Sequence, residues 1–290
     1  MASNENVEVL KYKKKIKPSA RRTAWASRVV IWIMCIIVII PILAVVSASM
    51  AKGNAFTQTS IFPKTFTLEN YVKVLTKTKF LVWIKNSVLL CISVAMIQLM
   101  LTMPAAFAFS KLKFKGRRYG LMSLLILQMF PTTMALPAIL GVAYKFNMMD
   151  NLWALTILLA GGSAYNIWLM KGYMDSIPKE LTESAYIDGA STFQAFAKII
   201  LPLIKNMMIV IFIFSFVGTY SEFYFTSALI KGADSQTVAT GMRVFILNQY
   251  AANWTQFAAA AIMASIPVVF IFVLSQKFFA QGLTAGSVKG

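Results

Sequence analysis

The sequence predicts an all-α polytopic membrane protein with six transmembrane helices. Of its 290 residues, 58% are hydrophobic and the mean hydropathy is +0.69, whereas soluble domains are about 45–50% apolar. Six apolar stretches are each long enough to cross ~30 Å of hydrocarbon. The basic residues are concentrated in the segments that would share one side of the membrane.

The N-terminal part of the chain predicts a basic cytoplasmic segment followed by the first span. Residues 1–28 carry eight Lys and Arg residues. The apolar run 29–50 is too long for a signal peptide and fits a transmembrane helix, kinked at Pro41. Polar residues 51–80 follow as an outer loop, in which a short helix begins near Thr67.

Five further spans follow, and proline or glycine marks an irregular point in several of them. We predict them at 81–110, 119–144, 152–170, 203–225 and 257–279. Pro131 and Pro137 predict a bend that faces the protein interior, and the Gly161-Gly162 pair predicts close helix contact. The six-helix domain thus covers 29–279, and 280–290 forms a tail.

Charge decides the orientation. With both termini in the cytoplasm, the inner side holds 19 of the 28 Lys and Arg residues, as the positive-inside rule requires. This topology explains the net charge of +18 without nucleic acid. Histidine is absent, and Cys35 and Cys91 lie in apolar runs as buried small hydrophobes. We therefore expect no catalytic residue and no metal site.

The segment 178–202 is polar and lies between two apolar runs. Pro178 suits a first helical turn, Gly189 suits a sharp bend, and Ser191 with Gln194 has the spacing of a capping box. Periodicity alone indicates an amphipathic connector whose one face carries four apolar residues, Phe193, Phe196, Ala197 and Ile200.

The same segment resembles the EAA loop of ABC-importer permeases, which reads Glu-Ala-Ala, three residues, Gly, nine residues and Ile-x-Leu-Pro. Here Glu183-Ser184-Ala185, Gly189 and 199–202 keep every spacing, with Ser184 replacing one alanine. The stretch WTQFAAAAIMASIPVVFIFVLSQKFFAQGLTAGSVKG is similar to the smaller permease of maltose and maltodextrin importers. Tyr220–Phe223 departs from the Trp-Asn-Asp/Glu-Phe of the broader sugar-permease group.

This resemblance implies a permease subunit of an ATP-driven importer in a bacterial cytoplasmic membrane. The cargo would be maltose or maltodextrin, with a galactooligosaccharide as the alternative. The implied partners are a second homologous permease, two ATPase subunits, an extracellular sugar-binding protein and membrane lipid. The chain has no GxxxxGK[ST] phosphate loop, so ATP and Mg would be used by the ATPase subunits and this chain would hold no cofactor.

The resemblance also implies site residues. Those expected to couple the chain to an ATPase are Glu180, Glu183, Ser184, Ala185, Asp188, Gly189 and Ala190. The tail residues Thr284, Gly286 and Lys289 would contact the ATPases, with a frayed terminus as the alternative. Asn248, Gln249 and Tyr250 would reach the binding protein, unless their loop only packs on its own subunit. No sugar-binding residue is implied.

Two other classes compete with this interpretation. A secondary transporter predicts ion-carrying residues in the spans and often inverted repeats, and the sequence shows neither a cluster of such residues nor a repeat. A membrane-embedded enzyme would need paired carboxylates or histidine. Glu222 is the one carboxylate within or beside a span, and it is a candidate for either a functional or an interfacial role.

Overall fold

The computed structural model describes residues 18–53, 65–247 and 252–284. Within these ranges the secondary structure is helical, apart from one isolated bridge between Ala51 and Phe66. The all-α prediction is therefore confirmed.

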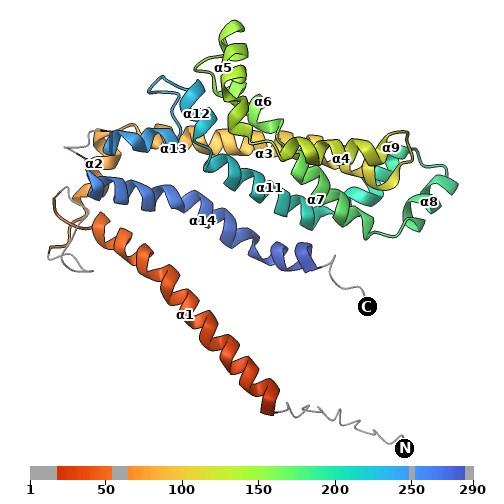
Figure 1. The fold of residues 1–290 in the computed structure, drawn as a ribbon, viewed down its shortest axis with the longest axis horizontal. Helices are drawn as coiled ribbons and strands as arrows, with labels where there is room; N and C mark the ends of the chain where they lie inside the picture. Colours follow the sequence, from red (N-terminus) through yellow and green to blue (C-terminus); the bar gives the residue numbers. More distant parts are fainter. Residues whose placement is uncertain (1–17, 54–64, 248–251, 285–290) are drawn as a thin grey trace, which may run out of the picture.

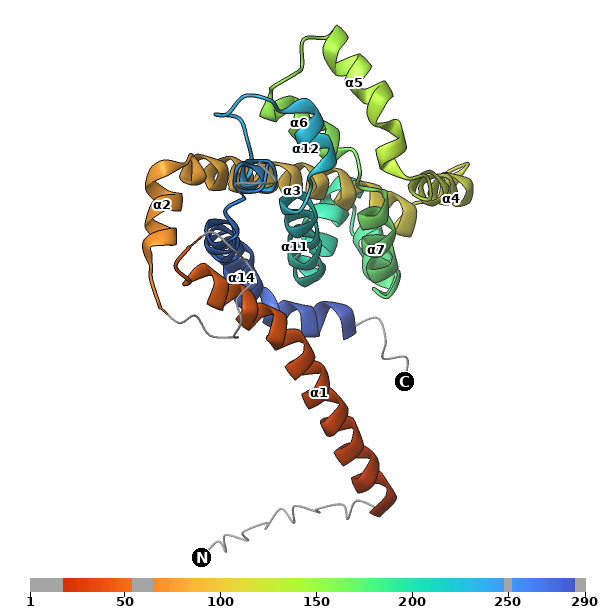
Figure 2. The same ribbon diagram turned by 60° about the vertical axis from the view of Figure 1, so that its left-hand side comes forward.

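Among the described residues, three helices are each long and apolar enough to cross a membrane: α1 (Pro18–Ser49), α3 (Phe80–Lys111) and α14 (Trp254–Thr284). The helix α3 runs through the middle of the molecule, while α1 diverges from the other helices in both views (Figures 1 and 2). Because α1 meets the rest of the chain only near its C-terminal end, Cys35 is exposed. The prediction that Cys35 is buried is wrong, whereas Cys91 is buried.

Three further candidate spans are bent. The helix α4 (Arg117–Gln128) and the following segment 132–145 are bent by 81° relative to each other. The helices α6 (Leu152–Ala160) and α7 (Ala164–Asp175) are bent by 46°. The segment 192–203 meets α11 (Lys205–Tyr220) at 78°. Counting each bent pair as one span gives up to six in the described chain, in agreement with the predicted number.

The structure corrects two details of these breaks. The segment after α4 continues as η1 (Thr132–Ala135) and α5 (Leu136–Lys145), and the break around Pro131 is exposed and does not face the interior of this chain. Gly161 and Gly162 are also exposed and form the break between α6 and α7, so they make no close contact with another helix in the described part of the chain. Sequence patterns locate such breaks but do not say which neighbour covers them.

The main core lies where α3, α7 and α11 pack together. Its buried apolar side chains are Leu99, Ala106, Phe107, Met170, Met174, Ile200, Ile204, Met207, Val210 and Ile211. Near one end of the molecule a second cluster joins α2 (Glu69–Lys77), the start of α3 and α14. The predicted short helix near Thr67 is α2, and the Glu69 N–H donates to Thr67 Oγ1 at 3.1 Å.

The 203–225 span is shorter than predicted. The helix α11 ends at Tyr220, and the chain continues after a break as α12 (Tyr224–Leu229). Glu222 lies in this break, where Oε1 accepts from the Phe225 N–H at 2.8 Å and Oε2 accepts from the Thr226 N–H at 2.9 Å. The carboxylate thus caps the first turn of α12, which gives it a structural role at the end of the span.

Candidate functional site

The 178–202 loop forms two short helical segments joined by a sharp turn, as predicted. The first is α8 (Glu180–Ile187); the second runs through α9 (Thr192–Ala195), a π turn (Phe196–Ile200) and α10 (Leu201–Leu203). This loop lies at one end of the long axis, opposite the end that carries α2 and α13 (Val238–Gly241) (Figure 1).

Gly189 makes the turn between the two segments. Its φ is +83°, and its N–H donates to the Tyr186 carbonyl at 3.1 Å. The Ala190 N–H donates to the Ala185 carbonyl at 2.8 Å. These two bonds form a Schellman motif, which ends a helix with a left-handed residue. The bend predicted at Gly189 is confirmed, and its cause is a backbone conformation that favours glycine.

The second segment begins with the predicted capping box. Gln194 N–H donates to Ser191 Oγ at 3.2 Å, and the Ser191 N–H donates to Gln194 Oε1 at 2.8 Å. The prediction for Pro178 is off by two residues, because Lys179 is the N-cap of α8 and Pro178 precedes it.

The predicted apolar face of the second segment is only partly right. Phe196 packs on Phe107 of α3, with ring centroids 5.1 Å apart, and Ile200 is fully buried, but Phe193 is 75% exposed. The π turn is the reason. It has more residues per turn than an α-helix, so the buried positions are Ala195 and Ile200, five apart instead of three or four.

The residues expected to couple to an ATPase divide into two sets. Glu180, Glu183, Ser184, Asp188 and Gly189 are exposed on the outside of the loop, and Ala190 is half-buried. Ala185 is buried on the inner side together with Thr182. Sequence reasoning missed Ile187, which ends α8 with a side chain that is 86% exposed. Ile187 and Phe193 together give this loop two strongly exposed apolar side chains, which are candidate contacts for a partner protein.

Polar contacts attach the loop to the end of α3. Lys111 Nζ donates to the Ile177 carbonyl at 2.6 Å, and Ser110 Oγ donates to Asp175 Oδ1 at 2.8 Å. Lys171 Nζ lies 2.5 Å from Asp175 Oδ2. These contacts hold the chain that directly precedes the loop against the end of α3, and Phe196 holds the second segment of the loop against the same helix.

At the opposite end, residues 230–247 pack on α2 and α3. Asn86 Nδ2 donates to the Asp234 and Gln236 carbonyls at 2.8 and 2.9 Å, and Lys79 pairs with Asp234 at 2.6 Å. The described part of this loop therefore packs on its own subunit. The predicted binding-protein contacts Asn248, Gln249 and Tyr250 lie outside the described residues. The predicted ATPase contacts Gly286 and Lys289, and the side chain of Thr284, also lie outside the described part of the structure.

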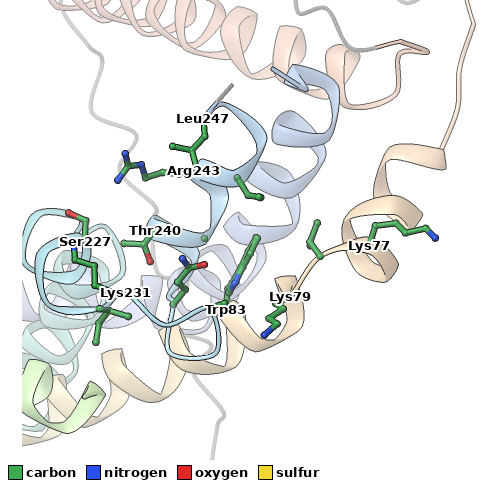
Figure 3. A pocket seen from close by; sticks show the side chains of 14 residues that line it. Lys77, Lys79, Trp83, Ser227, Lys231, Thr240, Arg243 and Leu247 are labelled. Atoms are coloured by element: carbon green, nitrogen blue, oxygen red, sulfur yellow. The ribbon is translucent and has the colours of Figure 1, made fainter. Parts of the chain in front are cut away.

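This end also carries a basic pocket of about 490 Å³ between the start of α3 and the 230–247 loop. Figure 3 shows Lys77, Lys79, Lys231 and Arg243 around it, with the Trp83 ring between the Lys79 and Thr240 side chains. Leu247 lines the pocket and directly precedes the predicted binding-protein contacts.

Comparison with known proteins matches residues 98–285 to the family described as binding-protein-dependent transport system inner membrane component. The match covers more than half of the chain. The chain belongs to this family. As a permease of this family it has curated relatives of known cargo and a solved structural relative.

Two relatives of this permease are from Bacillus subtilis. The maltodextrin transport system permease protein MdxG is 36% identical over 89% of this chain and 93% of its own length. The galactooligosaccharides transport system permease protein GanQ is 39% identical over 89% and 92%. The maltose/maltodextrin permease MalG of Vibrio vulnificus is 34% identical over 94% and 98%.

The fold of the permease also matches a solved structure. A chain of a bacterial ABC transporter involved in the import of the acidic polysaccharide alginate superposes with a TM-score of 0.79, covering 92% of this chain and 99% of that one, at 23% identity. At this level of identity the match establishes the fold, which is that of an ABC-transporter permease.

Proposed function

We propose that this permease carries maltodextrin or a related oligosaccharide into a bacterial cell as one subunit of an ATP-driven importer. The observation that carries the proposal is the 34–39% identity, over about nine tenths of the chain, to permeases named for maltodextrin and galactooligosaccharides. The partners are a second permease, two ATPase subunits and an extracellular sugar-binding protein. The chain supplies the membrane passage and not the hydrolysis of ATP.

In this proposal the α8 end of the molecule is cytoplasmic. In Figure 1, α14 runs away from the end of the molecule that carries α2 and toward the side that carries α8, and the N-terminal end of α1 also extends away from the α2 end. That arrangement supports two cytoplasmic termini. It also leaves the basic pocket on the outer side, where we expect the binding protein to dock.

The function test is uptake of labelled maltodextrin by the complex of this chain with its cognate partners in proteoliposomes. We expect uptake to need ATP, the binding protein and the ATPase subunits, and vanadate to stop it. Competition with a panel of unlabelled sugars then ranks maltodextrin against galactooligosaccharides. Uptake that survives vanadate and collapses with an ionophore would instead indicate a secondary transporter.

The 178–202 loop is the proposed coupling element. ATP binding closes the ATPase dimer, and a short helix held in the ATPase would pass that motion to the spans as a rigid-body displacement. The bonds from Ser110 and Lys111 at the end of α3 to Asp175 and Ile177, just before the loop, support this role. Exposed Ile187 is then an apolar anchor in the ATPase groove, and Glu183 pairs with a basic residue there.

Replacing Glu183 with alanine is expected to weaken ATPase binding about ten- to a hundredfold, because a hydrogen bond to a charged group contributes roughly 1.5–3 kcal/mol. The side chain is exposed in this chain, so folding should not change. The measurement is the amount of ATPase that co-purifies with the permease, together with sugar-stimulated ATP hydrolysis.

Glu69→Ala is the matched control, since Glu69 is an exposed glutamate that pairs with Lys73 on α2, far from the loop. Such surface pairs contribute little to stability, and this variant should retain its ATPase subunits. Wild-type co-purification and stimulation in Glu183→Ala would refute the role of Glu183.

A further inference from the structure

The basic pocket near α2 and α13 is lined by an excess of cationic side chains. Its volume is about 490 Å³, which is within the roughly 300–1,000 Å³ of small-molecule sites. Lys77, Lys79, Lys231 and Arg243 line it, and no described aspartate or glutamate is among the lining residues. The pocket therefore presents positive charge to a ligand.

Neighbouring carboxylates compensate only a part of this charge. Asp234 pairs with Lys79 at 2.6 Å. Asp150 Oδ1 accepts from the backbone N–H of Lys231 at 3.2 Å and not from its ammonium group. Of the four cations, only Lys79 forms an ion pair within the described part of the chain. The charges of Lys231 and Arg243 are thus left for a ligand.

A buried donor without a partner lies in the wall of the same pocket. Trp83 is 4% exposed, and its Nε1–H has no hydrogen-bond acceptor among the described residues. Phe80 and Phe245 hold the ring edge-on and offer no lone pair. Figure 3 shows the ring, with its nitrogen, between the Lys79 and Thr240 side chains. A buried unsatisfied donor is costly, so its place in the wall indicates an acceptor on a ligand.

Hydroxyl groups of the wall have already donated their protons. Thr78 Oγ1 donates to the Val74 carbonyl at 2.5 Å, and Ser227 Oγ donates to the Tyr224 carbonyl at 3.1 Å. The strong donors left for a ligand are ammonium, guanidinium and indole groups, and none of these can accept a hydrogen bond. Such a set fits an acceptor-rich, negatively charged group, because charge-assisted hydrogen bonds are the strong ones.

Apolar side chains complete the pocket. Ile230, Val244 and Leu247 line it, and Val244 and Leu247 are 55% and 67% exposed. These side chains can cover the carbon skeleton of a ligand, as apolar walls do in small-molecule sites. The wall therefore suits an organic anion better than a bare inorganic one.

We propose that this pocket binds a small organic oxyanion, a phosphate ester or a carboxylate, which contacts Lys231, Arg243 and the Trp83 Nε1–H. The inference goes beyond the proposed import and does not depend on which sugar is carried. A bound anion would neutralise part of the positive charge at this end of the molecule and so change the attraction of a charged docking partner. A phosphate ester can be free or part of a phospholipid headgroup, and the test separates these two sources.

The test measures how fast the Lys231 ammonium is acetylated, by mass spectrometry of the full complex in phosphatidylcholine nanodiscs at constant ionic strength. The probes are glycerol phosphate and glycerate, with uncharged glycerol for comparison. We expect at least one of the two anions to slow the labelling about tenfold at ten times its dissociation constant, because occupied sites are protected. Glycerol should have no effect. Lys145, an exposed residue at the end of α5 that does not line the pocket, is the internal reference.

Two variants test the contacts. Arg243→Gln removes a charge at an exposed position and should leave the fold intact, and Trp83→Phe removes the N–H while keeping an apolar ring. Each should raise the dissociation constant of the anion about ten- to a hundredfold, the range of a hydrogen bond with a charged partner. Lys145→Gln is the matched control, since it removes a charge outside the pocket and should leave the constant unchanged. Arg243→Gln decides alone if Trp83→Phe does not assemble.

Nanodiscs that contain phosphatidylglycerol separate the two sources. Slow labelling of Lys231 there without an added anion would assign the site to a lipid headgroup, and protection only by an added anion would assign it to a free ligand. Labelling that neither the lipid nor either anion changes would overturn the inference, as would wild-type affinity in Arg243→Gln. A complex that binds the anion but takes up no sugar would refute the proposed function alone.

Discussion

Replacement of Gly189 by valine is expected to reduce ATP-driven transport about tenfold or more. The φ of +83° at this residue costs a residue with a side chain roughly 1–2 kcal/mol, and a β-branched residue is a clear outlier there. The Schellman turn then loses its preferred geometry, and α8 no longer meets the ATPase in a fixed orientation. The measurements are sugar-stimulated ATP hydrolysis and co-purification of the ATPase subunits.

Two controls separate backbone strain from bulk. A Cβ added at Gly189 would meet nothing within 4 Å, so space is not the limiting factor. Gly189→Asn should retain most of the activity, because asparagine tolerates positive φ. Gly172→Val places the same side chain on α7, where there is also open space and φ is not positive. Equal activity of Gly189→Val and Gly172→Val would contradict the proposed role of the turn.

Replacing Gly241 with alanine is expected to destabilise the outer end of the protein by about 1–3 kcal/mol, the usual cost of overpacking. A Cβ at Gly241 would overlap the Trp83 ring. Trp83 has little room to move, because it is 4% exposed and packs edge-on against Phe80 and Phe245, with ring centroids 6.3 and 6.4 Å apart.

The measurement is the thermal unfolding temperature of the purified complex, with limited proteolysis of residues 230–247 as a local readout. We expect a lower unfolding temperature and faster cleavage, and slower uptake because the loop beside the predicted binding-protein contacts is displaced. Gly141→Ala is the control, since a Cβ there meets nothing within 4 Å. A Gly241→Ala complex as stable as Gly141→Ala would show that Trp83 can move aside.

Local chemistry made the 178–202 loop predictable in detail. The turn at Gly189 and the capping box of Ser191 and Gln194 depend on a few neighbouring residues, and both are present as expected. The exposed position of Phe193 was not predictable, because it follows from the π turn after Ala195. Predicting a helix face from the spacing of apolar residues assumes one constant number of residues per turn, and the π turn changes that number.

The sequence by itself determined the all-α class, the number of apolar spans and the family, because each depends on composition or on short motifs. Tertiary structure alone decided where the breaks around Pro131 and Gly161 face, since their surroundings come from distant parts of the chain. It also brought Gln98 and Ser215 to Asn166 across separations of 68 and 49 residues. No local pattern encodes such a meeting, because it arises only when α3, α7 and α11 pack against one another.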